Sequence, residues 1–169
     1  DRFVTDFIVL PFRSECEFPG CTNRARYTCA ETGSVRCIKH CTIRRDLTVS
    51  PEAFEAQLQA LAERGYHTVS LTDLYLHLTV GKPLPEKPVI LTFDDGYRDA
   101  YTVVFPLLQK YGFTATFFVL ATPAHYENPN YLTWAMMKEM ADAGMEIQGH
   151  GRDHVDLRGR SYEFLVYQI

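Results

Sequence analysis

Apolar residues follow two different spacings along the chain, and the two spacings alternate from Leu47 onward. Apolar residues spaced three or four positions apart predict helices. This spacing occurs at residues 50–65, 72–78, 98–111, 133–143 and 161–169. Short apolar runs lie between them and predict strands, at residues 66–71, 89–93, 113–120 and 145–148, with an earlier strand in residues 1–14. Residues 81–88 and 121–132, which are rich in proline or asparagine, are expected to be loops. Alternating strands and helices predict an α/β fold with a parallel sheet.

Local signals indicate where several helices begin. Ser50 followed by Pro51 is typical of an N-cap with proline in the first helical turn. Thr72 and Asp73 are expected to cap the next helix. Pro106 falls inside the helix predicted for residues 98–111, where its missing N–H should perturb the regular turn.

Two adjacent carboxylates, Asp94 and Asp95, directly follow the strand predicted for residues 89–93. Ligands and metals in α/β folds are bound at the carboxyl ends of strands. Neighbouring side chains on an extended backbone point to opposite sides. One carboxylate can therefore bind a metal while the other faces a water or a substrate.

Two histidines, His150 and His154, follow the strand predicted for residues 145–148. At this spacing both imidazoles can reach one metal, and with one carboxylate they leave coordination positions open for water. An open metal beside a spare carboxylate is suited to hydrolysis. Each motif alone is common, since Asp-Asp-Gly often forms an ordinary turn and paired histidines often lie on a surface. Their occurrence together, each at a strand end, favours a metal site.

The sequence Thr92-Phe93-Asp94-Asp95-Gly96, followed by His150-x-x-x-His154, resembles the polysaccharide deacetylases of carbohydrate esterase family 4. The resemblance covers Leu47 to Ile169. It implies a distorted (β/α) barrel in which Asp94 is the catalytic base and Asp95, His150 and His154 bind a divalent cation, with Zn²⁺ expected.

The resemblance also implies hydrolysis of N-acetyl or O-acetyl groups on a polysaccharide or oligosaccharide, and a location outside the cell or in its envelope. Tyr126, Tyr131 and Trp134 could offer aromatic surface to a sugar ring, or could simply pack. An amidase acting on a non-sugar substrate is a related alternative. A further alternative is a non-catalytic fragment that binds metal together with carbohydrate or protein.

Three departures from the family pattern bear on activity. Gly151 stands where a serine or threonine usually follows the first histidine, and Ile8–Phe12 lacks the usual Tyr-His of the first strand. The later family motifs, which supply an arginine that orients the base and a histidine that acts as general acid, are not found in the chain.

All five cysteines lie in residues 15–41, a segment atypical of this family. Cys16, Cys21, Cys37 and His40 have the spacing of a second, structural zinc site. Disulfides and free thiols are the alternatives, and five cysteines would leave one unpaired in a disulfide framework. We therefore divide the chain into residues 1–46, a first strand with a Cys-rich insertion, and residues 47–169, a deacetylase-like domain.

Composition narrows the classes of partner. The chain has 169 residues, of which 46% are hydrophobic, so it can bury a core. Its formal net charge of −4 disfavours a nucleic-acid surface. No apolar stretch is long enough to span a membrane, and no signal peptide is found in the chain, which begins at Asp1. With only about five strands visible, we expect an incomplete barrel whose open edge could support self-association.

Overall fold

The computed structural model describes residues 7–9, 27–28, 35–36 and 49–169. Five strands in these residues form one sheet, in which every neighbouring pair is parallel. The strand order is β1 (Phe7–Val9), β5 (Pro88–Phe93), β6 (Thr116–Val119) and β7 (Glu146–Gly149), and β4 (His67–Thr68) also pairs with β5. This confirms the predicted parallel α/β architecture.

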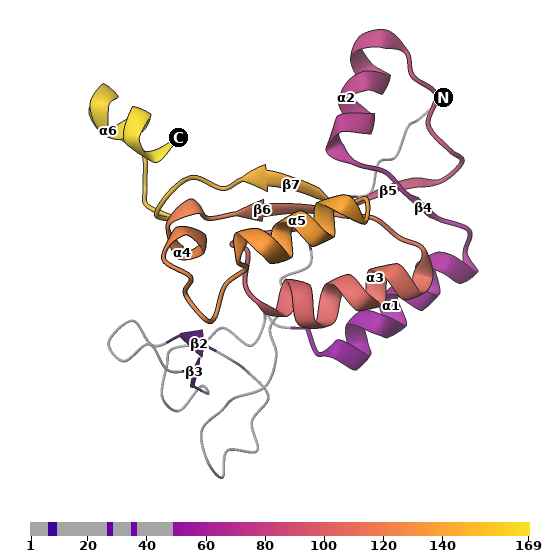
Figure 1. Ribbon diagram of the computed structural model, residues 1–169. Coiled ribbons are helices and arrows are strands. Elements are labelled where there is room, and N and C mark those ends of the chain that lie inside the picture. The colour runs from indigo at the N-terminus through magenta and orange to yellow at the C-terminus, as the bar shows by residue number, and fades with distance from the viewer. Residues whose placement is uncertain (1–6, 10–26, 29–34, 37–48) are drawn as a thin grey trace.

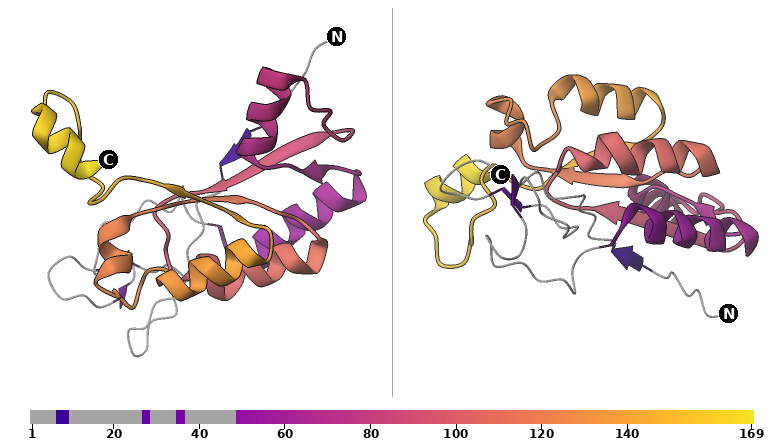
Figure 2. Two further views of the ribbon diagram at one scale, coloured as in Figure 1. Left: turned by 45° about the horizontal axis from the view of Figure 1, so that its top comes forward. Right: turned by 90° about the horizontal axis from the view of Figure 1, so that it is seen from below.

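The helices lie on both sides of the sheet but cover it unequally (Figure 1). One face carries α1 (Pro51–Glu63), α3 (Phe105–Tyr111) and α5 (Trp134–Asp142). Helix α2 (Leu71–Val80) lies across the other face near the amino ends of the strands, as both Figure 1 and the left view of Figure 2 show. The remaining helices, α4 (Ala121–His125) and α6 (Tyr162–Gln168), lie at the carboxyl ends.

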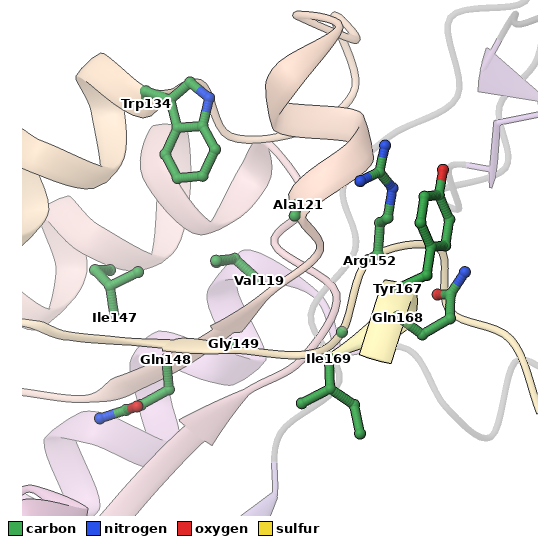
Figure 3. A pocket seen from close by; sticks show the side chains of 11 residues that line it. Val119, Ala121, Trp134, Ile147, Gln148, Gly149, Arg152, Tyr167, Gln168 and Ile169 are labelled. Carbon is green, nitrogen blue, oxygen red and sulfur yellow. The ribbon is translucent and has the colours of Figure 1, made fainter. Parts of the chain in front are cut away.

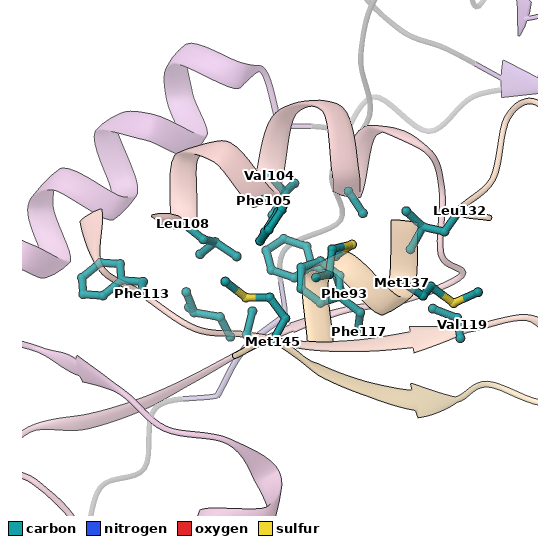
Figure 4. Close-up of a cluster of buried hydrophobic side chains, with 14 of the residues drawn as sticks. Phe93, Val104, Phe105, Leu108, Phe113, Phe117, Val119, Leu132, Met137 and Met145 are labelled. Atoms are coloured by element: carbon teal, nitrogen blue, oxygen red, sulfur yellow. The ribbon is translucent and has the colours of Figure 1, made fainter. Parts of the chain in front are cut away.

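The hydrophobic core fills the space between the sheet and helices α1, α3 and α5 (Figure 4). Phe93 of β5 stacks on Phe117 of β6 with ring centroids 5.0 Å apart, and Phe54 of α1 meets Phe93 edge-on at 5.8 Å. All three side chains are buried. Burying a phenylalanine side chain contributes about 1.5–3 kcal/mol, so this aromatic cluster stabilises the packing of α1 on β5 and β6.

The opposite face of the sheet is more polar and is centred on Glu146 at the start of β7. Its carboxylate accepts hydrogen bonds from the N–H groups of Leu71 and Thr72, at 2.9 and 3.2 Å, and from Thr116 Oγ1 at 2.6 Å. Burial would raise the pKa of Glu146, but hydrogen bonds from Thr116, Thr72 and Leu71 together lower that pKa. A negative charge at the amino end of α2 is favourable, so Glu146 anchors that helix to the sheet.

The start of α2 corrects the predicted boundary. Ser70, not Thr72, is the N-cap: its side chain accepts a hydrogen bond from the N–H of Asp73, and the Asp73 carboxylate accepts one from the Ser70 N–H. This reciprocal capping box satisfies two N–H groups at once, which Thr72 could not do from inside the helix. Ser70 therefore ends the strand predicted for residues 66–71, and only His67–Thr68 pair in the sheet.

Two further segments show how proline acts. Residues Ala100–Val104 form a wide π-helical turn, after which Pro106 occupies the first turn of α3. The predicted perturbation by Pro106 is thereby confirmed, because the irregular turn lies directly before the residue that lacks an N–H. The predicted loop at residues 121–132 is wrong in part, since its first five residues form α4 despite Pro123.

The Cys-rich segment is described only at β2 (Tyr27–Thr28) and β3 (Val35–Arg36), which pair antiparallel. The predicted zinc ligands Cys16, Cys21, Cys37 and His40 lie outside the described residues, so that prediction stays a prediction. In the part of the chain that is described, β7 has β6 as its only strand neighbour, and the sheet stays open. Among these same residues, no helix combines the length and the apolar character needed to cross a membrane.

Candidate metal centre

A tight turn after β5 places the first candidate ligand. Asp95 and Gly96 both have left-handed backbone conformations, with φ of 70° and 71°. A Cβ atom on Gly96 would lie 3.1 Å from Cβ of Val119 and 3.3 Å from its Cα. Any larger residue at position 96 would therefore be strained and would press on Val119, and the close approach brings Asp95 to the carboxyl end of the neighbouring strand.

Asp95 meets both histidines of the downstream motif at this end of the sheet. The Oδ1 atom of Asp95 lies 3.4 Å from Nε2 of His150 and 3.4 Å from Nε2 of His154. The three candidate ligand atoms all lie within 4.8 Å of one another, and the two imidazole centroids are 5.3 Å apart. Asp95 and His150 are half-buried, while His154 is exposed.

These separations fit a metal ion. Ligand atoms held tetrahedrally at about 2.0–2.1 Å from Zn²⁺ are separated from one another by about 3.3–3.4 Å. The two distances from Asp95 Oδ1 have this value. One carboxylate and two imidazoles are also a donor set that divalent transition metals accept, with positions left for water.

The loop carrying the histidines is attached to the segment that follows β6. The His150 N–H donates to the Val119 carbonyl at 2.8 Å. The next contacts run the other way: the N–H groups of Ala121 and Thr122 donate to the carbonyls of Gly151 and Arg152, at 3.2 and 3.1 Å. These backbone hydrogen bonds hold the main chain from His150 to Arg152 in place without any contribution from side chains.

The same loop contains two conformations that favour small residues. Gly151 has φ of 78°, and His154 has φ of 52°, which is uncommon for a residue with a Cβ atom. Asp153, between them, accepts hydrogen bonds from Thr122 and Gln168, which lower the pKa of its carboxyl group. A constrained backbone beside a candidate ligand is typical of functional loops.

Asp94, the predicted base, is exposed and does not belong to the converging group of three. It directly follows Phe93, whose ring lies in the core beside α1 and β6. Asp94 lies just beyond the last residue of β5, outside the ladder of the sheet. The structure thus separates the two carboxylates, and the catalytic role of Asp94 stays a prediction.

Two hollows lined by residues of the described part of the chain adjoin this end of the sheet. One, of about 670 Å³, is lined by His150 and His154 together with residues of the loop that follows them and the end of α6. The other, of about 400 Å³, is lined by Trp134, Arg152 and Tyr167 among others (Figure 3). The Arg152 guanidinium lies over the Tyr167 ring, 4.2 Å from its centroid.

The three predicted aromatic contacts for a sugar have different surroundings. Trp134 is exposed and lines the smaller hollow. Tyr131 stacks on Tyr97 with ring centroids 4.9 Å apart, as expected for packing. Tyr126 is exposed, contacts His125 edge-on, and lines neither of the two hollows.

Sequence reasoning missed the residues of α6 that border the site, chiefly Tyr167 and Gln168. The amphipathic pattern of residues 161–169 predicted the helix but not the element that it contacts. Arg152 was visible inside the histidine motif, yet its stacking on Tyr167 depends on how α6 folds back. No local signal in the sequence marks these contacts.

The fold and the site define an open parallel α/β protein with a two-histidine, one-carboxylate cluster at the carboxyl ends of its strands. The sequence model of the polysaccharide deacetylases matches residues 81–169, and the chain belongs to this family.

Individual relatives agree with that assignment. YxkH of Bacillus subtilis is 41% identical over 113 residues, which cover 67% of this chain and 40% of YxkH. The poly-β-1,6-N-acetyl-D-glucosamine N-deacetylase of Escherichia coli K12 is 35% identical over 120 residues, 63% of this chain and 18% of the relative. The solved structure of the Streptococcus pyogenes deacetylase PplD, in complex with acetate, has 28% identity and a TM-score of 0.71, over 96% of this chain and 63% of PplD. The chain therefore spans less than two thirds of each of these relatives.

Proposed function

We propose that this chain carries the metal-binding part of a deacetylase that hydrolyses acetyl groups on a polysaccharide. The observation that carries the proposal is the position of Asp95 Oδ1, 3.4 Å from the Nε2 atoms of both His150 and His154. Two similarities support the reaction class. The Escherichia coli relative is named as an N-deacetylase of an N-acetylglucosamine polymer, and the Streptococcus pyogenes deacetylase was solved with acetate, the acid that deacetylation releases.

Asp95, His150 and His154 would hold the metal, and Zn²⁺ is the ion that we propose because it favours tetrahedral nitrogen and oxygen ligands. A bound divalent cation supplies a polarised acetyl carbonyl and a water of lowered pKa. Asp94 is exposed and directly precedes Asp95 in the chain. Its carboxylate is not buried in the core and can accept a proton from the attacking water. The hollow lined by His150 and His154 gives the acetylated sugar a place beside the ligands.

The test is acetate release from an acetylated oligosaccharide of β-1,6-linked glucosamine. Asp94→Asn should abolish acetate release while elemental analysis still finds the metal, because only the proton acceptor is changed. Asp142→Asn is the matched control, since Asp142 ends α5 and pairs with Lys138 on the surface. Wild-type protein that binds metal but releases no acetate from any acetylated oligosaccharide would contradict the proposal and favour a binding role.

A further inference from the structure

Gln168 is unusual in the terminal helix. Of the α6 residues it alone is buried, with 4% of its surface exposed, whereas Tyr162, Val166 and Tyr167 are largely exposed. Burying an amide is unfavourable unless its polar atoms find partners. The Gln168 side chain forms its hydrogen bonds with Asp153, in the loop between His150 and His154.

Three hydrogen bonds join Gln168 to that loop. The carbonyl of Gln168 accepts from the Arg152 N–H at 2.9 Å. Its side-chain Oε1 accepts from the Asp153 N–H at 3.1 Å, and its Nε2 donates to Asp153 Oδ2 at 2.6 Å. The side-chain amide thus uses its acceptor and its donor on one residue, a pairing that neither a carboxylate nor an apolar side chain can reproduce.

The loop is held from its other side as well. Gly151 and Arg152 accept backbone hydrogen bonds from Ala121 and Thr122, so the loop lies between the start of α4 and the end of α6. The Gly151 Cα approaches Gln168 closely, since a Cβ there would lie 3.4 Å from the Gln168 carbonyl oxygen. His154 directly follows this clamped segment and has φ of 52°, a conformation that tertiary contacts must maintain.

We propose that Gln168 is a positioning residue of the metal centre, which holds the Arg152–Asp153 backbone so that His154 meets Asp95. The inference rests on the proposed function, because it assumes that Asp95, His150 and His154 bind a metal. The hydrogen bonds of Gln168 described above go to Arg152 and Asp153 and not to the three candidate ligands. Its effect passes through the peptide that connects Asp153 to His154.

The experiment exchanges the hydrogen-bond donor of Gln168 and the acceptor of Asp153, using the full chain. Gln168→Glu removes the donor and sets two carboxylates against each other. Zn²⁺ affinity, measured by calorimetry, should fall about 10–100-fold, the usual cost of losing an outer partner of a metal site. In Asp153→Asn/Gln168→Glu, the new Asn amide can donate to the new carboxylate, and affinity should return to within about threefold of wild type.

A second readout separates positioning from general stability. The visible spectrum of bound Co²⁺ reports ligand geometry, so it should change in Gln168→Glu and recover in the double variant. A lower melting temperature with unchanged Zn²⁺ affinity and an unchanged Co²⁺ spectrum would overturn the inference. If Gln168→Glu does not fold, the double variant decides: wild-type affinity supports the pairing, and weak affinity overturns it.

Asp95→Ala distinguishes a wrong metal site from a wrong role for Gln168. If it leaves Zn²⁺ binding unchanged, the metal site itself is wrong, whatever Gln168 does. If it lowers the number of Zn²⁺ ions bound per chain while Gln168→Glu binds like wild type, the metal site stands and the role given to Gln168 falls.

Discussion

His154 Nε2 lies 3.4 Å from Asp95 Oδ1, although the two residues follow different strands that are not neighbours in the sheet. Asp95 follows β5, His154 follows β7, and β6 lies between them. The contact exists because all three strands run parallel and end at the same edge. Because the Asp95 carboxylate makes this contact, removing the carboxylate should weaken metal binding.

Asp95→Ala should weaken Zn²⁺ binding by more than about 100-fold, since loss of a ligand should exceed the 10–100-fold typical for an outer partner. His125→Ala is the control, because His125 is an exposed histidine at the end of α4 and lies outside the converging group. Calorimetry and metal content per chain check both variants. Equal losses in the two variants would contradict the assignment of the ligands.

Gly96→Ala should destabilise the fold more than Gly112→Ala. Both glycines have φ near 70°, so both substitutions carry the strain of a left-handed alanine, about 1 kcal/mol. Only at Gly96 would the new Cβ also lie 3.1 Å from Val119, while nothing lies within 4 Å at Gly112. Urea unfolding of the two variants measures the difference. Equal losses in the free energy of unfolding would show that the contact of the new Cβ atom with Val119 does not destabilise the fold.

Glu146→Gln should lower the free energy of unfolding at pH 7 by about 1–3 kcal/mol, because an amide nitrogen would face the N–H and O–H groups that now donate to the carboxylate. The folded-state pKa of Glu146 lies below its ordinary value of 4.5. The contribution of the Glu146 carboxylate to the free energy of unfolding is therefore fully present above pH 4.5 and is lost as the pH falls through the folded-state pKa.

The difference in the free energy of unfolding between wild type and Glu146→Gln should accordingly become smaller below pH 4.5. Urea denaturation at pH 7 and at a series of acidic pH values gives this difference directly. A gap that is constant down to the acid unfolding of the wild type would mean that Glu146 does not bind its proton more weakly in the folded state.

Phe117→Ala should cost about 3–5 kcal/mol of stability, since it empties a fully buried position stacked on Phe93. Tyr162→Ala, on the exposed side of α6, should change stability by less than about 0.5 kcal/mol. Thermal unfolding of both variants tests the comparison. A small loss at Phe117 would indicate that the sheet–helix interface can repack around the missing ring.

The spacing of apolar residues was sufficient to predict the helix after Ser50 and the strand before Asp94, and the structure has both. Such elements are readable because their signals are local: an N-cap with proline, and a run of apolar residues covered on both faces. The boundary at Ser70 was not readable in the same way. The sequence predicted Thr72 and Asp73 as the cap, whereas the reciprocal hydrogen bonds between Ser70 and Asp73 make Ser70 the N-cap.

The sequence by itself determined the chemical types of the candidate ligands, because Asp95 and the His150-x-x-x-His154 motif each follow a predicted strand. Only the tertiary structure decided that they converge, since strand order and the approach of Gly96 to Val119 depend on packing between distant segments. The same holds for Gln168, whose amide reaches Asp153 only after α6 folds back. Local interactions specify strands, helices and turns, whereas the meeting of the strand ends depends on the order and direction of the strands in the sheet.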